Sequence, residues 1–460
     1  MSIDPLDGPA AGLKESLAAA IDHDAAHIAA VGDDIFAHPE LAYQEFRTAD
    51  VVARELRALG LPVEEGLART GVRARVVGSR PGPVVCVLAE LDALHAPEHP
   101  AADPGTGAAH ACGHNAQVAH LVGVARAMTE RAAAGELAGE VVFFAVPAEE
   151  YSDIGRPGVS DVEFPGGKQE LIRLGCFDGV GLALMAHASG VPEVAPAAPG
   201  AGRPTAALGM DWQYTGFTTR RAVFHGRSAH ASSAAGHGVD ASAAARIALH
   251  AIDAQRGTFA EDVRVHPVLR AHPASLNVIA DQATVDTLIR GRSARSIADA
   301  ERRVDRALRA GALAVGAVVE LTSAPGFLPL AVDRTLGGLF RRNALVLAGD
   351  AGWAEHDFSA ASTDAGDLSH LMPVMHATHG GCAGVNHSAR FRVVDPVRAY
   401  VQPAKALAWT VVDLLHGDAA AARDAIAGYR PRHTRAGYVD AMRATTRRAR
   451  YPEAAEPWTC

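Results

Sequence analysis

The 460-residue sequence is poor in cysteine, and its cysteines form no motif. Cys86, Cys112, Cys176, Cys382 and Cys460 are odd in number and scattered, and none forms a CxxC pair. A disulfide framework pairs its cysteines and therefore needs closely spaced cysteines in an even number. The sequence therefore excludes a disulfide framework and is typical of a chain in a reducing compartment.

Long apolar runs and an excess of positive charge are also missing. No stretch approaches the run of about 18 apolar residues that a membrane-spanning helix needs, and residues 1–17 carry acids where a secretion signal needs a basic start. The 52 acidic and 43 basic residues give a net charge of −9, which offers no general attraction for polyanions. We expect a cytoplasmic protein with neither a membrane nor a nucleic-acid partner.

Several nucleotide and nucleophile motifs are absent as well. The GGK at 166–168 lacks the upstream glycine and the hydroxyl residue of a phosphate loop, and GTGAAH at 105–110 lacks the third glycine of a dinucleotide-binding turn. No GxSxG elbow is present. These absences argue against nucleotide binding and against a serine hydrolase of the α/β type.

Helical and strand patterns alternate over the first 188 residues. Helices are predicted over 12–32, 43–60 and 114–132, and strands over 72–78, 83–92, 140–150 and 180–188. Strands that are apolar along their whole length belong to a sheet covered on both faces. The pattern therefore predicts an α/β domain with a central sheet.

A second pattern begins after residues 189–211, a segment rich in Pro, Gly and Ala that we interpret as a connection. Strands and helices then follow in the order β-α-β-β-α-β, a ferredoxin-like unit of α+β type, with 275–281 as a possible extra strand. A single core seldom grows past about 300 residues. We therefore expect a domain at 211–324 inserted into one formed by 1–210 and 325–460. The Arg-rich tail, 418–460, is interpreted as a solvated extension.

Potential metal ligands stand at the ends of the predicted strands, where open α/β sheets bind their ligands. Cys112 and His114 lie in HACGH, at the start of a predicted helix, and a thiolate and an imidazole suit zinc. Glu149 and Glu150 end the apolar strand VVFFAVPA, where two adjacent carboxylates need a cation or a proton to offset their repulsion. Each pair alone also fits a plainer role, a core thiol with a helix-start histidine or a solvated acidic loop.

Two further histidines continue this pattern. His187 ends the strand LALMAHA, and His387 lies in a Gly-rich loop. A lone histidine is more often structural than a ligand, but several at strand ends are a stronger signal. Together with the thiol and the two carboxylates they could hold two metal ions and leave one carboxylate for proton transfer.

The motifs, taken in order, resemble those of the zinc-type metallopeptidase and aminoacylase family. Within it the sequence is similar to the amidohydrolase branch of p-aminobenzoyl-glutamate hydrolases, auxin-conjugate hydrolases and N-acyl amino acid deacylases. The resemblance spans about residues 12 to 416. The motifs that carry it are HPELAYQEF (38–46), AELDAL (89–94), HACGHN (110–115), PAEE (147–150), LMAH (184–187), GRSAHAS (226–232), STDAGDLSHLMP (362–373) and VNHS (385–388).

The resemblance implies a role for each matching residue of the metal centre. It makes Glu149 the general base and Asp92 an outer carboxylate that orients a ligand. The implied ligands of a dinuclear centre are Cys112, His114, Glu150, His187 and His387. The cofactors would be two divalent ions, zinc first, with manganese or cobalt as alternatives.

The resemblance also makes the inserted domain a lid and a dimerisation domain. It implies that His230 reaches into the active site of the partner subunit of a homodimer and stabilises an oxyanion. Asn277 and Arg290 match positions that bind substrate, and an arginine suits a carboxylate.

The implied activity is hydrolysis of a linear amide by metal-activated water, with an N-acyl or aminobenzoyl amino acid or a dipeptide-like molecule as substrate. Two alternatives stay open. One is a hydrolase of another amide, such as a carbamoyl compound or a natural product; the other is a metal-binding relative without catalysis, for which Glu149 would be unnecessary. The sequence departs from the branch at Glu90, at Asn115 and in the longer segments 95–109 and 151–168, and the two longer segments bear on the identity of the substrate.

Overall fold

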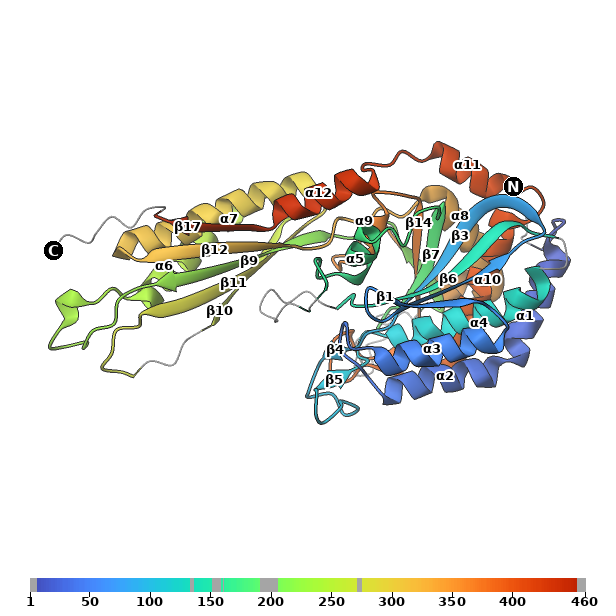
Figure 1. Cartoon of the computed structure of the whole chain (residues 1–460), viewed down its shortest axis with the longest axis horizontal. Coiled ribbons are helices and arrows are strands. Elements are labelled where there is room, and N and C mark those ends of the chain that lie inside the picture. The colour runs from blue at the N-terminus through green and yellow to red at the C-terminus, as the bar shows by residue number, and fades with distance from the viewer. Residues whose placement is uncertain are drawn as a thin grey trace.

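The computed structural model describes residues 6–132, 136–150, 159, 161–190, 206–270 and 275–452. These residues build two large β-sheets, each with its own hydrophobic core. Figure 1 shows the two sheets in different halves of an elongated molecule. We call the part around the larger sheet the large domain and the part around the smaller sheet the small domain.

The large domain contains a mixed sheet of eight strands among the described residues, in the order β1-β2-β6-β3-β7-β14-β8-β13. The four central strands β6, β3, β7 and β14 run parallel, and β2 and β8 flank them in antiparallel orientation. The strands are β1 (Val63–Leu67), β2 (Gly71–Val77), β3 (Arg80–Glu90), β6 (Ala138–Val146), β7 (Leu182–Ala188), β8 (Leu208–Asp211), β13 (Trp353–His356) and β14 (Val374–His379). The apolar runs of β6 and β7 follow from this central position, because helices and loops cover both faces.

Helices pack on this sheet and on one another. Helix α4 contacts β3 and β7, α10 contacts α4 and α8, and α8 contacts β8 and β14. The helices of the large domain are α1 (Ala11–His23), α2 (Ala25–Ala37), α3 (Phe46–Ala58), α4 (His114–Ala132), α5 (Gly167–Arg173), α8 (Arg334–Ala348), α9 (Ala365–Leu368), α10 (Gln402–Leu415), α11 (Ala420–Gly428) and α12 (Arg435–Thr445). No helix in the described part of the chain is long and apolar enough to cross a membrane.

The small domain has a fully antiparallel sheet with α6 and α7 on one face. Its elements are β9 (Gly216–His225), α6 (Ala241–Asp253), β10 (Arg264–Arg270), β11 (Gln282–Gly291), α7 (Ala294–Val315) and β12 (Val318–Pro325). Their sheet order, β10-β11-β9-β12, is the order of a ferredoxin-like unit, as the sequence predicts. Gly311 lets α7 approach α6 closely, since a Cβ there would lie 2.4 Å from the carbonyl oxygen of Ala244.

Three expectations about secondary structure are wrong. The predicted connection 189–211 contains β8, while residues 191–205 lie outside the described part. Residues 275–281 form turns with one isolated bridge, between Val278 and His230, instead of a strand. Leu276 is fully exposed there, so its side chain gains nothing from a sheet.

The third wrong expectation concerns the Arg-rich tail. Residues 418–460 are not a solvated extension throughout, because they contain α11, α12 and a strand, β17 (Arg447–Tyr451), which pairs with β12. Arg448 and Arg450 pair with Glu320 on β12, so two of the tail's arginines are cross-strand ion-pair partners. The strand therefore belongs to the sheet of the small domain, whereas the sequence pattern predicts 325–460 as part of the large domain.

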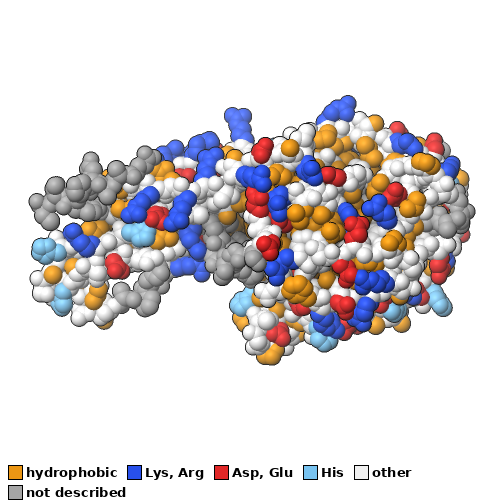
Figure 2. Space-filling model, viewed as in Figure 1, with side chains coloured by type: hydrophobic (Ala, Val, Ile, Leu, Met, Phe, Trp, Pro, Cys, Tyr) orange, Lys and Arg blue, Asp and Glu red, His pale blue; other side chains and the backbone are white. Residues whose placement is uncertain are grey.

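The outline of the molecule is indented beside the small domain. Figure 2 shows a hollow between the small domain and the lobe that carries the short ribbon of β4 (Leu94–His95) and β5 (Ala108–Ala109). The predicted long loop 95–109 lies in this lobe. Of the other long segment, 151–168, residues 151–158 and 160 lie outside the described part.

Candidate metal centre

The central strands of the large sheet bring most of the predicted ligands together. Glu149 and Glu150 follow β6, Asp92 follows β3, and His187 lies near the end of β7. These strands run parallel, so their carboxyl ends meet at one edge of the sheet. Cys112 and His114 reach the same edge from the start of α4.

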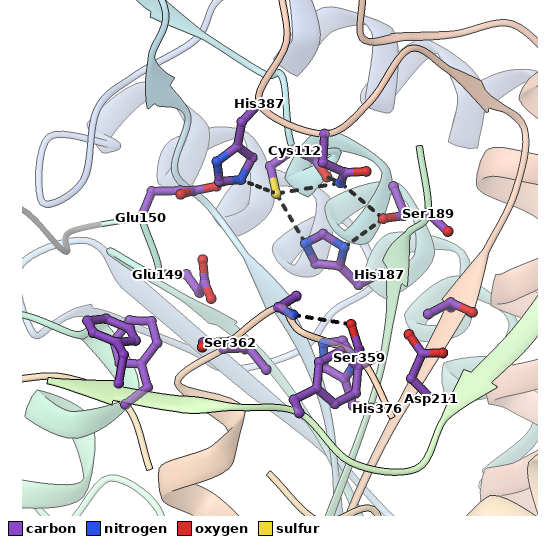
Figure 3. A pocket seen from close by; sticks show the side chains of 18 of the residues that line it. Cys112, Glu149, Glu150, His187, Ser189, Asp211, Ser359, Ser362, His376 and His387 are labelled. Atoms are coloured by element: carbon purple, nitrogen blue, oxygen red, sulfur yellow. Dashed lines mark hydrogen bonds and ion pairs between the residues drawn. The ribbon is translucent and has the colours of Figure 1, made fainter. Parts of the chain in front are cut away.

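Cys112 lies at the centre of the cluster. Its Sγ is 3.4 Å from Nε2 of His187 and 3.2 Å from Nε2 of His387. The same nitrogen of His387 is 3.1 Å from Oε1 of Glu150. Figure 3 shows the thiol between the two imidazoles, with Glu150 beside His387.

The donor atoms form overlapping groups that could each hold a metal ion. Within the described residues, one group is Cys112 with His114 and His187, and another is Cys112 with Glu150 and His387. The ligand atoms of each group lie within 4.8 Å of one another, and both groups share the thiol. A third group joins His114 to Glu90 and Glu149.

The chemistry of these donors fits metal binding. Nε2 of His114 and Oε1 of Glu150 are buried and lie 3.1 Å from Oε2 of Glu90 and 3.1 Å from Nε2 of His387, respectively. Ionisable groups that are buried this close together are costly unless opposite charge offsets them, and a cation would bind both atoms. One thiol, imidazoles and a carboxylate are the donor types that structural and catalytic zinc sites use.

Asp92 holds the surrounding backbone in place. Its two carboxylate oxygens accept hydrogen bonds from the amides of Glu149 and Glu150, at 3.1 and 2.8 Å. Its carbonyl oxygen lies 2.8 Å from Nδ1 of His114. A hydrogen bond from Nδ1–H leaves Nε2 of His114 free to bind a metal.

Strained backbone supports one candidate ligand, His387, and the candidate base, Glu149. His387 itself and Ala148, which precedes Glu149, both adopt positive φ angles, 66° and 55°. Residues other than glycine rarely adopt this conformation, and it persists where the surrounding structure imposes it. The amide of His387 donates to the carbonyl of Ala111 at 2.7 Å, which ties the His387 loop to the HACGH segment.

The two adjacent glutamates have opposite electrostatic environments. Burial, and then the charges of Glu90 and Glu150, raise the pKa of Glu149 well above its usual range. Burial also acts on Glu150, but hydrogen bonding to His387 and the charges of the neighbouring histidines outweigh it and lower its pKa to about 2. These environments keep Glu150 ionised and favour a protonated Glu149.

The thiol is also shifted towards its ionised form. Burial and the charge of Glu150 raise the pKa of Cys112, but the positive charge of His187 and hydrogen bonds from His114 and His187 outweigh them, so that the pKa falls to about 6. Hydrogen bonds to Cys112 and Glu150 raise the pKa of His387 to about 11. A thiolate is the form in which cysteine binds metals.

A buried ion cluster behind the centre was not predicted from the sequence. Nζ of Lys168 is 2.5 Å from Oε1 of Glu90 and also contacts the carboxylate of Asp364. The second oxygen of Glu90 lies 3.1 Å from Nε2 of His114. Lys168 belongs to the GGK segment, whose local pattern gives no sign of a partner about 200 residues away in sequence.

The metal centre opens into a cavity of about 310 Å³ between the two domains. Arg290, on β11 of the small domain, lines this cavity, and its Nη1 donates to Oγ of Ser362 at 2.7 Å. His230 and Asn277 do not line the cavity of their own chain; both are exposed on the small domain. The structure thus brings Arg290 to the centre and leaves the other two predicted residues outside it.

Other residues of the cavity wall were missed as well. Asn386 precedes His387, and its Nδ2 donates to the carbonyl oxygens of Cys112 and Ala188 at 3.2 Å. His376 lies on β14, a strand that the sequence pattern does not predict, so its position in the sheet is not evident from the sequence. The alternation of His376 and Thr378 along MHATH is the signal that could have placed both on one face.

A family model, peptidase family M20/M25/M40, matches residues 86–446. The chain belongs to this family. The match confirms the resemblance that the motifs indicate, and the predicted class of enzyme, a metal-dependent hydrolase of amide or peptide bonds, agrees with it.

Curated relatives and solved structures of the M20 family extend this comparison. The Xaa-Arg dipeptidase of Mus musculus is 28% identical over 426 residues, which cover 88% of this chain and 89% of the mouse protein. The N-acyl-L-amino acid amidohydrolase of Geobacillus stearothermophilus is 32% identical over 177 residues, which span 38% of this chain and 44% of that protein. A dinuclear metal binding peptidase of family M20 from Bacillus subtilis covers 86% of this chain and 99% of its own, with a TM-score of 0.65 and 22% identity. This last likeness establishes the fold, a mixed α/β domain with the smaller antiparallel one.

Proposed function

We propose that this M20 protein is a metal-dependent amidohydrolase that cleaves the amide bond of an N-acyl or aminobenzoyl amino acid or of a dipeptide-like substrate. The observation that carries the proposal is the shared thiol of Cys112. It belongs to two groups of candidate ligands at once, and a buried carboxylate outside those two groups, Glu149, lines the same cavity. Two ions beside a proton acceptor are one arrangement by which a protein can activate water to hydrolyse an amide.

The proposed ligands fall into two sets. Cys112, His114 and His187 would hold one ion, and Cys112, Glu150 and His387 would hold the other. When bound, two divalent cations lower the pKa of a water molecule and polarise a carbonyl group. Zinc fits a set with a thiolate and imidazoles best, and manganese or cobalt are the alternatives.

Glu149 is the proposed general base. Its side chain is buried and lines the cavity, and Asp92 fixes its backbone amide. It would take a proton from the attacking water on a carboxylate oxygen and return that proton to the nitrogen of the leaving amine. The high pKa of Glu149 reflects its burial and the negative charges of Glu90 and Glu150, and nearby cations would offset both effects.

Arg290 is the proposed site for the carboxylate of the substrate. Its guanidinium group lies in the cavity, packs over the ring of Phe217 at 5.4 Å and forms no ion pair with an acidic side chain of the described residues. A planar guanidinium can bind a carboxylate through two parallel hydrogen bonds. The distance between this group and the metal centre then selects substrates by length.

We propose a homodimer formed through the small domain, in which His230 and Asn277 serve the site of the partner. Strand β10 lies at the open edge of the small sheet, and Val268, Leu269 and Leu276 are exposed at or near it. Nδ1 of His230 accepts from the amides of Ser232 and Ser233, both at 3.2 Å, so the proton of a neutral imidazole is on Nε2. His230 can therefore donate a hydrogen bond to an oxyanion.

We also place the protein in the cytoplasm. The four cysteines in the described part of the chain are buried free thiols, which fits a reducing compartment.

The decisive test replaces the proposed base. Glu149→Gln keeps the size of the side chain but removes the proton acceptor, so we expect the loss of about 100-fold or more in kcat that removal of a general base causes. Because Glu149 is not in the proposed ligand sets, the variant should bind two equivalents of zinc per chain, as measured by metal analysis. The substrate panel would contain N-acetyl amino acids, p-aminobenzoyl-glutamate, dipeptides and an N-carbamoyl amino acid, with release of free amine as the readout.

A matched control is Glu140→Gln, which changes a half-buried glutamate on β6, the strand that precedes Glu149; Glu140 pairs with Arg75 far from the centre. It should leave turnover and metal content unchanged. Full activity of Glu149→Gln would contradict the assignment of the base. Cleavage of the carbamoyl compound alone would replace the proposed substrate class by the alternative one.

A further inference from the structure

The face of the large sheet that carries His187 continues into a polar wall of the cavity. Thr378 on β14 pairs with His187 on β7, and alternate residues along a strand share a face, so His376 lies on this face too. On the next strand Gly209 pairs with Thr378, which brings Asp211 beside His376. We call His376, Thr378, Asp211 and the neighbouring Tyr214 the β14 wall; all four line the cavity.

His376 is a residue of this wall to which neither the metal centre nor the proposed carboxylate site assigns a role. Its side chain is only 3% exposed, and its ring stacks against that of His187 with the centroids 5.8 Å apart. Nδ1 lies 3.2 Å from the hydroxyl of Tyr214. Nε2 is buried and has no hydrogen-bond partner among the described residues, although the side chain lines the cavity.

The neighbours of His376 determine which nitrogen carries its proton. The side chain of Tyr214 hydrogen-bonds that of Asp211, and because a carboxylate oxygen accepts, the Tyr214 hydroxyl donates to Asp211. The oxygen of that hydroxyl then accepts from Nδ1–H of His376. This order leaves Nε2 of a neutral imidazole as a lone-pair acceptor at the cavity wall.

We infer that His376 is a specificity-determining residue whose Nε2 accepts a hydrogen bond from an N–H group of the substrate. The inference rests on the proposed function, because it concerns the substrate of the same site. It assigns the β14 wall to a part of the substrate that carries an amino or other N–H donor, distinct from the carboxylate that Arg290 binds. Figure 3 shows His376 and Asp211 on the far side of His187 from Glu150 and His387.

The two walls of the cavity are complementary to such a substrate. Arg290 offers only donors, whereas His376 and the carboxylate of Asp211 offer acceptors. An apolar group at the β14 wall would displace water and leave Nε2 buried without a partner. A site built to hydrogen-bond a donor rejects the analogue that lacks it. The expected substrates therefore carry a carboxylate and a separate N–H donor.

The test compares substrates that differ only in a donor. One pair is p-aminobenzoyl-glutamate and p-toluoyl-glutamate, in which a methyl group replaces the amino group of the acyl part. The other is N-acetyl-ornithine and N-acetyl-norleucine, in which the donor is on the amino acid. In at least one pair we expect kcat/KM of the wild type to favour the donor by about tenfold or more, mainly through KM.

Variants of His376 test whether its hydrogen-bond acceptor, and not the fold of the cavity, causes the substrate preference. His376→Leu should abolish the preference, so that the ratio of kcat/KM for the donor-bearing member to kcat/KM for the apolar member falls by about tenfold or more. His376→Gln, which keeps an acceptor oxygen, should restore part of it. The matched control is His379→Gln, because His379 is a buried histidine on the same strand that does not line the cavity; it should keep the full preference. Equal losses for both members of a pair in His376→Leu would overturn the inference.

A binding measurement distinguishes this inference from the proposed function. Calorimetric titration of the zinc-loaded protein with ornithine, norleucine, p-aminobenzoate and p-toluate needs no turnover. If no panel substrate is cleaved, but the wild type binds the donor-bearing member of a pair more tightly and His376→Leu does not, the proposed function fails and the β14 wall stands. If the wild type cleaves or binds both members of every pair equally well, the inference about His376 is overturned and the proposed function is not.

Discussion

Single side chains in this protein acquire their properties from neighbours that are distant in sequence. Glu149 and Glu150 are adjacent, yet the pKa of one is raised and that of the other lowered. His387, more than 200 residues away, contacts only the second of them. Divergent environments of two carboxylates are how one site obtains both a ligand and a proton acceptor.

Another buried carboxylate lies outside the metal centre. Asp367, on α9, accepts hydrogen bonds from the hydroxyl of Tyr438 at 2.8 Å and from Nε2 of Gln169 at 3.4 Å. Burial is the main cause that raises its pKa to about 8, with the charge of Asp364 adding to it, against the lowering effect of Tyr438. Asp367 is therefore protonated in the folded protein at neutral pH.

This shift predicts a pH dependence of stability. In the unfolded chain an aspartate ionises near pH 3.9, so between about pH 4 and 8 the folded state binds one more proton at Asp367. Stability contributed by this group is complete below about pH 4 and is lost as the pH rises to about 8. Asp367→Asn keeps the acceptor for Tyr438 and removes the titration, so its loss of stability over this range should be smaller, by an amount on the order of a few kcal/mol at most.

Thermal or urea unfolding at several pH values from about 5 to 8 would measure this difference. The exposed Asp424→Asn, on α11, is the control and should follow the wild type. If the free energy of unfolding changes with pH in the same way for the wild type and for Asp367→Asn, Asp367 titrates in the folded protein as it does in the unfolded chain.

At the scale of elements, the spacing of apolar residues predicts the helices and strands in which that spacing is regular over many residues. The helix predicted over 114–132 is α4 to the residue, and the strands at 72–78 and 180–188 agree with β2 and β7 within two residues. Strands β8 and β13 have four residues each and pair with each other at the edge of the sheet. Such short segments carry too few side chains for a periodicity to emerge.

The residues of the candidate site were predictable only where they stand at the ends of clearly predicted helices and strands. Cys112, Glu149, Glu150 and His187 stand at or just beyond the ends of elements with strong signals, and chemistry at strand ends is a local pattern. Lys168 and Asp364 could not be paired from the sequence, because their contact depends on how α5 and the loop before α9 pack. His376 was missed because the strand that carries it was missed.

The C-terminal segment α12–β17 joins both domains. Tyr438 on α12 bonds to Asp367, and Arg443 pairs with Glu163, both in the large domain. Two residues beyond α12, β17 pairs with β12 of the small domain over five positions. Tyr451 completes the contact, with the guanidinium of Arg309 4.0 Å from its ring centroid. The family match ends at residue 446, before this strand.

Removal of β17 should loosen the small domain and leave the metal centre intact. Truncation after Thr446 exposes the edge of β12, so about every second amide of β12 loses its partner. We expect faster hydrogen exchange in Val318–Pro325, while zinc content stays unchanged. A chain truncated after Pro452 keeps β17 and is the matched control. Unchanged exchange in β12 after the shorter truncation would show that β9 and α7 alone hold this strand.

At the scale of the whole molecule, the position of His230 favours function across two chains. The residue is exposed on the small domain and does not line its own cavity, where Arg290 of the same domain does. The neutral tautomer with the proton on Nε2 makes it a donor that lacks an acceptor in its own chain among the described residues. A twofold dimer would supply each cavity with the His230 of the other subunit.

Mixing two inactive variants tests this arrangement. Glu149→Gln lacks the base and His230→Ala lacks the donor, so each homodimer should be inactive or nearly so. In a mixed dimer, the His230→Ala chain keeps Glu149 and receives His230 from the other chain, which restores one site in two. Random exchange of equimolar variants should therefore recover about a quarter of the wild-type activity.

Glu149→Gln mixed with Cys112→Ser is the control that cannot recover, because both changes affect the centre and neither chain keeps it complete. Differently tagged chains would verify by co-purification that mixed dimers form. Mixed dimers without activity, or a chain that light scattering shows to be monomeric while fully active, would contradict the role of His230.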